Sequence, residues 1–167
     1  SDYMTNMQWC AETNIYATEA IAEFEGMALP TVSVPRDRPS RFSAPHQHLA
    51  RSLRNISADD EFVAYQTRMA FRLARHLARV NEIGDAVVEA DLDDAADVLG
   101  GRPATWEECE VALEDFVLAD SAGSHDEALL ALFHRRNIRA QMLNGPAGSA
   151  MTRHNPIQPF SQSPGSR

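Results

Sequence analysis

Apolar residues recur at intervals of three and four along most of this chain, which is the spacing of one face of an α-helix. One such stripe lies between Trp9 and Phe24, and another lies within residues 62–80. No run alternates apolar and polar residues beside a hairpin turn, so the pattern predicts no strand. The sequence therefore predicts an all-α protein, a bundle of five or six helices.

The first predicted helix ends near Gly26. Its apolar stripe consists of Trp9, Thr13, Tyr16, Ala17, Ala20 and Phe24. We expect this stripe to face the core, because an apolar helix face needs a packing partner. Cys10 and Cys109 also fall at apolar positions of separate helices, and we expect both to be buried thiols.

Capping signals predict where the later helices begin. Ser57, followed by three acidic residues, predicts the start of a long helix that runs to about Ile83. The chain then continues, as a helix or as a pair of turns, around Gly84, and Gly100 is a natural terminator.

Two later pairs of residues have the spacing of a capping box, in which a hydroxyl and a carboxylate satisfy free amides at a helix start. Thr105 with Glu108 predicts the start of one helix, and Ser124 with Glu127 predicts the start of the next. The sequence "NGP" from Asn144 is a strong break after the last helix.

A chain of 167 residues fits one domain, which we expect to be a helical bundle over residues 1–145. Within it, four prolines predict an extended arm over residues 27–45. Residues 146–167 are predicted to form an extended C-terminal arm, whose last residues, 161–167, we expect to be disordered. The arm residues predicted to bind a partner are Val32, Val34, Met151, Arg153, His154, Ile157 and Phe160.

Charge is segregated along the chain, whose formal net charge is -9. Residues 83–127 contain fourteen acidic residues against the single Arg102, whereas the last forty residues contain five arginines and no acid. A second basic patch, residues 36–54, holds five arginines against Asp37. This pattern favours attraction within the chain or between copies, and it argues against a nucleic-acid backbone as the partner. We expect the C-terminal arm to lie across an acidic surface of its own domain, of a second copy or of a larger partner.

No apolar run approaches the length needed to cross a bilayer, and the chain does not begin with the basic and apolar segments of a signal peptide. We therefore expect a cytoplasmic protein without membrane contact.

Six histidines raise the question of a metal site. A di-iron bundle needs a Glu three residues before a His, and no histidine of this chain has one. His46 and His48 are two residues apart and would point to different sides of a helix. The sequence thus predicts neither a metal nor another cofactor.

Four arginines form one stripe on the long helix: Arg68, Arg72, Arg75 and Arg79. Either the acidic helices between Glu82 and Glu127 pair with this stripe, or it binds an anionic ligand, with Arg136 as an added member. His76 lies in the apolar stripe of the same helix. It is either a hydrogen-bonded core histidine or a weak candidate for a catalytic base.

These patterns favour a non-catalytic helical accessory subunit that associates with itself or with a larger protein through its arms. The alternative is a helical enzyme or ligand-binding domain that holds an anionic small molecule with the arginine stripe and His76. Nucleic-acid binding is disfavoured by the net charge.

Overall fold

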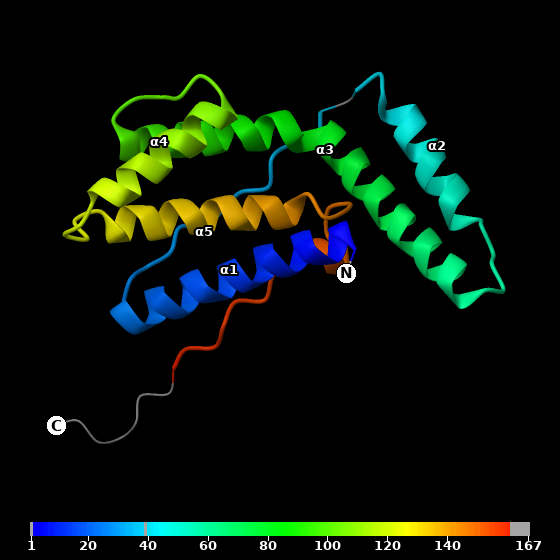
Figure 1. The fold of residues 1–167 in the computed structure, drawn as a ribbon, viewed down its shortest axis with the longest axis horizontal. Coiled ribbons are helices and arrows are strands. Elements are labelled where there is room, and N and C mark those ends of the chain that lie inside the picture. Colours follow the sequence, from blue (N-terminus) through cyan, green and yellow to red (C-terminus); the bar gives the residue numbers. More distant parts are fainter. Residues whose placement is uncertain (1, 39, 161–167) are drawn as a thin grey trace.

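The structure is a computed structural model that describes residues 2–38 and 40–160. The described residues form five α-helices, one short 3₁₀ turn and no strand, which confirms the prediction of an all-α bundle (Figure 1). The elements are α1 (Tyr3–Glu25), α2 (Ser43–Arg54), α3 (Glu61–Leu99), α4 (Trp106–Ala119), α5 (Asp126–Met142) and η1 (Ala150–Thr152). The predicted disorder of residues 161–167 lies outside the described residues.

The helices are arranged in two parts that share α3. Helices α4 and α5 pack with the C-terminal half of α3, while α2 lies against its N-terminal half (Figure 1). Helix α1 packs mainly on α5 and contacts the N-terminal half of α3 through Arg72. The bundle part contains a core cluster from three helices, made of Leu92, Ala95, Cys109, Leu113 and Leu132. Helix α2, in contrast, contains no buried residue.

Helix α3 is a single helix of 39 residues, so the chain continues as a helix through Gly84. It changes direction near its middle (Figure 1). Gly84, a residue type that weakens a helix locally, belongs to the central part of α3 in the sequence. Asp60 caps its start, because the Asp60 carboxylate accepts a hydrogen bond from the Val63 amide at 2.9 Å. The prediction that Ser57 is the cap is wrong. Gly100 ends the helix with a φ of 75°, a conformation that favours glycine.

One of the two predicted capping boxes is present. The Thr105 hydroxyl accepts from the Glu108 amide at 3.2 Å, and the Glu108 carboxylate accepts from the Ala104 amide at 3.0 Å. At the start of α5, however, the Asp120 carboxylate accepts from the amides of Ser124 and His125. The Ser124 prediction is wrong, because α5 begins at Asp126, so that His125 and not Ser124 occupies the N-cap position, and no described side chain caps the helix there.

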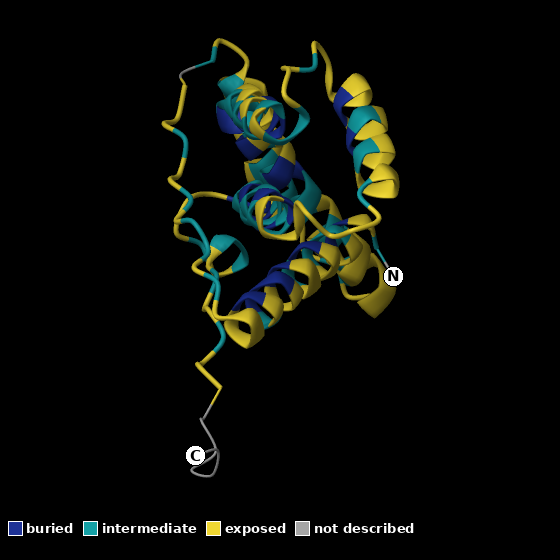
Figure 2. Ribbon diagram, turned by 90° about the vertical axis from the view of Figure 1, so that its left-hand side faces the viewer, coloured by how far each residue is buried: buried dark blue, intermediate teal, exposed yellow. Residues whose placement is uncertain are grey.

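Helix α1 turns the opposite side to the core from the one expected. The stripe from Trp9 to Phe24 faces outward, and the Trp9 and Phe24 side chains are 71% and 79% exposed. Figure 2 shows the buried residues along one side of α1 and the exposed residues along the other. The buried side consists of Met4, Ala11, Ile15, Thr18, Glu19 and Ala22. Half of these side chains, Ala11, Thr18 and Ala22, are small and let α5 approach α1 closely. Cys109 is buried as expected, whereas Cys10 is exposed.

The segment between α1 and α2 runs from the end of α1 past α5 to the middle of α3 (Figure 1). There the Asp37 carboxylate lies 2.6 Å from the Arg79 guanidinium, and the Arg38 amide donates to the Glu82 carbonyl at 3.1 Å. Val32 is half-buried and Val34 is 57% exposed. This arm is thus attached to its own chain through its C-terminal end.

Candidate functional site

The arginine stripe of α3 divides between two neighbours. Arg72 turns to α1, where its guanidinium donates to the Thr5 hydroxyl at 3.1 Å and to the side-chain Oε1 of Gln8 at 2.9 Å. Arg79 is buried and donates to Asp37 at 2.6 Å and to Glu82 at 3.0 Å. Both arginines therefore have structural partners within the chain.

The other two members of the stripe have no carboxylate partner among residues 2–38 and 40–160. Arg75 lies 5.5 Å from the centre of the Phe71 ring, a cation–π distance. Within the described residues, neither Arg68 nor Arg75 forms an ion pair with any acid. Pairing of the stripe with the acidic segment is thus limited to the contact between Arg79 and Glu82.

Helix α5, rather than the stripe, neutralises part of the acidic segment. Arg139 donates to Asp91 and to Asp94, each at 2.5 Å, and Arg135 donates to Asp94 at 2.8 Å. Burial raises the pKa of the Asp91 carboxyl, while the hydrogen bond from Arg139 opposes that change. The attraction expected between the acidic and basic segments is therefore present within one chain.

Arg136 lies apart from the stripe. It is 4.4 Å from the centre of the Trp106 ring and forms an ion pair with Glu110. It lines a pocket of about 530 Å³ between α1, α3, α4 and α5, next to Asn14 and Val87. The structure therefore does not bring Arg136 into a common site with Arg68, Arg72, Arg75 and Arg79.

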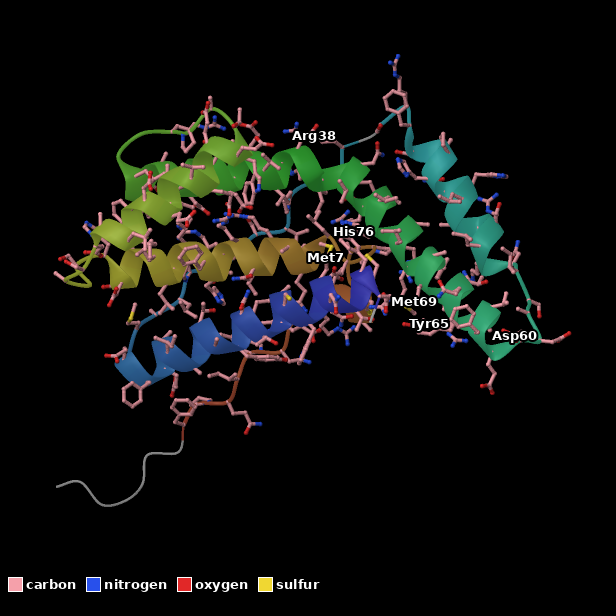
Figure 3. All side chains as sticks on the ribbon, viewed as in Figure 1. Met7, Arg38, Asp60, Tyr65, Met69 and His76 are labelled. Carbon is pink, nitrogen blue, oxygen red and sulfur yellow. The ribbon has the colours of Figure 1, made fainter. Side chains whose placement is uncertain are left out.

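His76 is a core residue with a structural hydrogen bond. It lies where α3 crosses the ends of α1 and α5 (Figure 3) and is 7% exposed. Its Nδ1 is 2.8 Å from the Leu143 carbonyl oxygen, and because a carbonyl only accepts, Nδ1 donates. In the described part of the chain, the ring makes no other hydrogen bond. Of the two alternatives, a core histidine or a catalytic base, this environment favours the hydrogen-bonded core histidine.

The C-terminal arm lies on α1 of its own chain. His154 Nε2 is 2.5 Å from a carboxylate oxygen of Glu19, whose other oxygen accepts from the Ile157 amide at 3.0 Å. The Phe160 amide donates to Glu23 at 3.0 Å, and the Phe160 side chain is 52% exposed. The sequence left open whether the arm lies on its own domain, on a second copy or on a larger partner. In the structure, the arm lies on an acidic surface of its own domain.

The remaining predicted arm residues make weaker contacts. Met151 is half-buried in η1, and the Arg153 side chain is exposed, although the Arg153 carbonyl accepts from Gln141 at 3.1 Å. The two arms meet at a pocket of about 280 Å³, where Leu29 of the first arm faces Ile157 of the second. Both arms therefore help to close the fold around α1 and α5.

The most unusual surface is the side of α1 that faces away from α5, which we call the outer face of α1. It consists of Tyr3, Asn6, Trp9, Cys10, Thr13, Tyr16, Ala17, Ala20, Ile21 and Phe24. All of these are exposed except Ala20, which is half-buried, and none is charged. Glu23, which is exposed and lies seven residues after Tyr16, is at the edge of this face. The C-terminal arm contacts one edge of this face, where the His154 ring lies 5.4 Å from the Tyr16 ring. Because a helix that is apolar on both sides is normally enclosed, the remaining exposed residues form a surface that no described element covers.

His134 gives the protein a predicted pH response. Burial lowers the pKa of His134 below its ordinary 6.5, Glu19 opposes this, and His154 and Arg135 add to it. Below the ordinary value the unfolded chain binds more protons, so the free energy of unfolding should fall from about pH 6.5 downward. Thermal unfolding should show a smaller loss of stability on acidification in His134→Gln than in the wild type. The exposed His48→Gln is the control, and an unchanged pH profile in His134→Gln would contradict the expectation.

Comparison with known proteins adds no relative: no protein-family model, curated protein or solved structure matches the chain. Over residues 2–38 and 40–160, no helix is long and apolar enough to cross a membrane. The same residues contain no group of three or more His, Cys, Asp or Glu side chains that fits a metal ion. The outer face of α1 and the arginines of α3 therefore remain the surfaces on which a function can be argued.

Proposed function

We propose that this protein is a non-catalytic helical subunit that associates with a second copy of itself through the outer face of α1. The observation that supports this is the uncharged, aromatic surface that α1 exposes along its whole length. Contiguous exposed apolar surfaces of this kind are typical of interaction sites. Association as a function retains the leading hypothesis from the sequence, but it moves the contact surface from the arms to α1.

The distribution of side-chain sizes favours a second copy as the occupant. Large residues, Trp9 and Phe24, stand toward the two ends of the outer face, and small residues, Thr13, Ala17 and Ala20, stand between them. In an antiparallel pair of α1 helices, Trp9 of one copy lies opposite Phe24 of the other. The two-fold axis then falls between Tyr16 and Ala17, so Tyr16 of one copy lies opposite the small Ala17 of the other and the face is complementary to itself.

The size of the face is also sufficient. Its five large side chains, Tyr3, Trp9, Tyr16, Ile21 and Phe24, are between 42% and 79% exposed. In the antiparallel pair, Tyr3 lies beyond the end of the partner's α1, so covering the other four would bury roughly 550 Å² per copy. The total of about 1,100 Å² is above the roughly 1,000 Å² expected of a specific interface. The absence of charge on the face removes local repulsion between copies, although each carries a net charge of -9.

The test is the molar mass in solution. Light scattering of the full chain over a concentration series should give twice the 18.5 kDa of one chain. The double variant Trp9→Glu with Phe24→Glu places four carboxylates in the interface and should weaken the dimer by about a hundredfold or more. The matched control is Val111→Glu with Leu118→Glu on α4, where both side chains are 61% or more exposed. It adds the same charge and should leave the dimer intact.

A cysteine experiment reads out the orientation of the same dimer. In the antiparallel pair, Cys10 lies roughly 20 Å from its copy, too far for a disulfide, whereas Ala17 lies near the axis. Ala17→Cys in a Cys10→Ser background should therefore form a disulfide-linked dimer on oxidation, and the wild type should not. A monomeric wild type, or equal dissociation of the α1 and α4 variants, would contradict the proposal.

A further inference from the structure

A second surface of the molecule carries an unusual charge for so acidic a chain. Helices α2 and α3 enclose a groove of about 680 Å³, and no residue of α1 lines it. Four arginines line it, two from each helix: Arg51, Arg54, Arg75 and Arg79. Glu82 is the single acidic residue of the lining. We call this the α2–α3 groove.

Three of these arginines are not neutralised within the described residues. Arg79 is paired with Asp37 and Glu82, but Arg51, Arg54 and Arg75 have no carboxylate within 4.0 Å. In addition, the Nε of the buried Arg79 has no hydrogen-bond partner. The groove therefore combines an excess of positive charge with an unsatisfied buried donor in its wall.

Helix stability alone does not account for this set. Arg51 and Arg54 are in the last turn of α2, where a cation interacts favourably with the helix dipole. Arg75, however, lies in the interior of α3, where the dipole gives no such benefit. Its guanidinium rests over the Phe71 ring, so it is held in place at the groove without any charge partner. A ligand with negative charge would provide the missing partner.

We propose that the α2–α3 groove binds a small organic phosphate ester. A phosphate group offers several oxygens and up to two charges, which suits several guanidinium forks better than one carboxylate does. The apolar part of the lining, Phe71 with Ala50, Ala78 and Pro146, suits the organic part of such a ligand. The volume lies in the range of small-molecule sites. A nucleic acid is disfavoured, because the net charge of -9 repels a long phosphate backbone.

Calorimetric titration with three probes tests the proposal: phenyl phosphate, benzoate and inorganic phosphate. Phenyl phosphate should bind about tenfold more tightly than benzoate, which has the same ring but one charge, and more tightly than inorganic phosphate, which lacks the ring. The variant Arg51→Gln with Arg75→Gln should lower the affinity for phenyl phosphate by at least about tenfold. Circular dichroism should confirm that this variant keeps its helical content.

The control separates the groove from general charge. Arg36→Gln with Arg153→Gln removes the same number of charges at two exposed positions outside the groove, and it should leave the affinity for phenyl phosphate unchanged. The absence of phenyl phosphate binding, or an equal loss of affinity in the two double variants, would overturn the proposal. Neither variant touches the outer face of α1, so dimer formation should be the same in both.

Discussion

Replacing Arg139 by alanine should lower the free energy of unfolding by about 3–5 kcal/mol, because it leaves a buried carboxylate without its partner. The Arg139 guanidinium donates to Asp91 and to Asp94, and Asp91 is 5% exposed. Without Arg139, the Asp91 carboxylate loses its ion pair at a site where burial already raises its pKa. Denaturant unfolding followed by circular dichroism measures the effect.

A second variant separates the effect of the lost ion pair from the effect of the lost side-chain volume. In Arg139→Met with Asp91→Leu, both charges are removed, and Asp94 keeps its contact with Arg135. This variant should recover most of the stability that Arg139→Ala loses, because apolar residues of similar volume often replace a buried ion pair without loss. An Arg139→Ala variant that unfolds with less than about 1 kcal/mol of destabilisation would mean that water reaches and screens Asp91.

Replacing Leu132 by alanine should lower the free energy of unfolding by about 2–5 kcal/mol. Leu132 is 0% exposed and belongs to the cluster in which α3, α4 and α5 meet. The loss combines the buried methyl and methylene groups with a cavity that rigid neighbours such as Leu113 and Cys109 do not fill. Equilibrium unfolding with urea gives the value.

The matched control for Leu132 is the same substitution on the surface. Leu118 on α4 is 75% exposed, so Leu118→Ala should change the free energy of unfolding by no more than about 0.5 kcal/mol. Similar losses for both variants would show that the cluster of α3, α4 and α5 is not the principal core of the protein.

The elements of this fold were predictable from local signals, but their orientation was not. The periodicity predicted the helices, and Thr105 and Gly100 act as expected at their ends. Helix α1 shows the limit, since it has two apolar sides. Periodicity favoured the side with Trp9 and Phe24 because its residues are larger. The buried side combines Met4 and Ile15 with small residues such as Ala11, so its apolar stripe contains fewer large residues than the exposed side, and packing against α5 decided the orientation.

The candidate sites were also predicted in part. The stripe on α3 was visible from its spacing, yet the structure assigns Arg72 to α1 and Arg75 to the α2–α3 groove. The arginines that α2 contributes belong to the basic patch of residues 36–54, which was visible in the sequence. The spacing of residues within α2 does not show that α2 packs against α3, so the groove between the two helices was not predicted. The charge pattern did predict an acidic support for the C-terminal arm, which the structure places at Glu19 and Glu23.

The lack of any buried residue in α2 has a consequence for the dynamics of the molecule. This helix can separate from α3 without exposing the core cluster, so its local opening requires less free energy than global unfolding does. A ligand that contacts Arg51 on α2 and Arg75 on α3 would bind only the closed arrangement of the two helices. The concentration of the ligand would then determine the fraction of molecules in which α2 is docked on α3. Ligand binding and the docking of α2 would therefore be coupled.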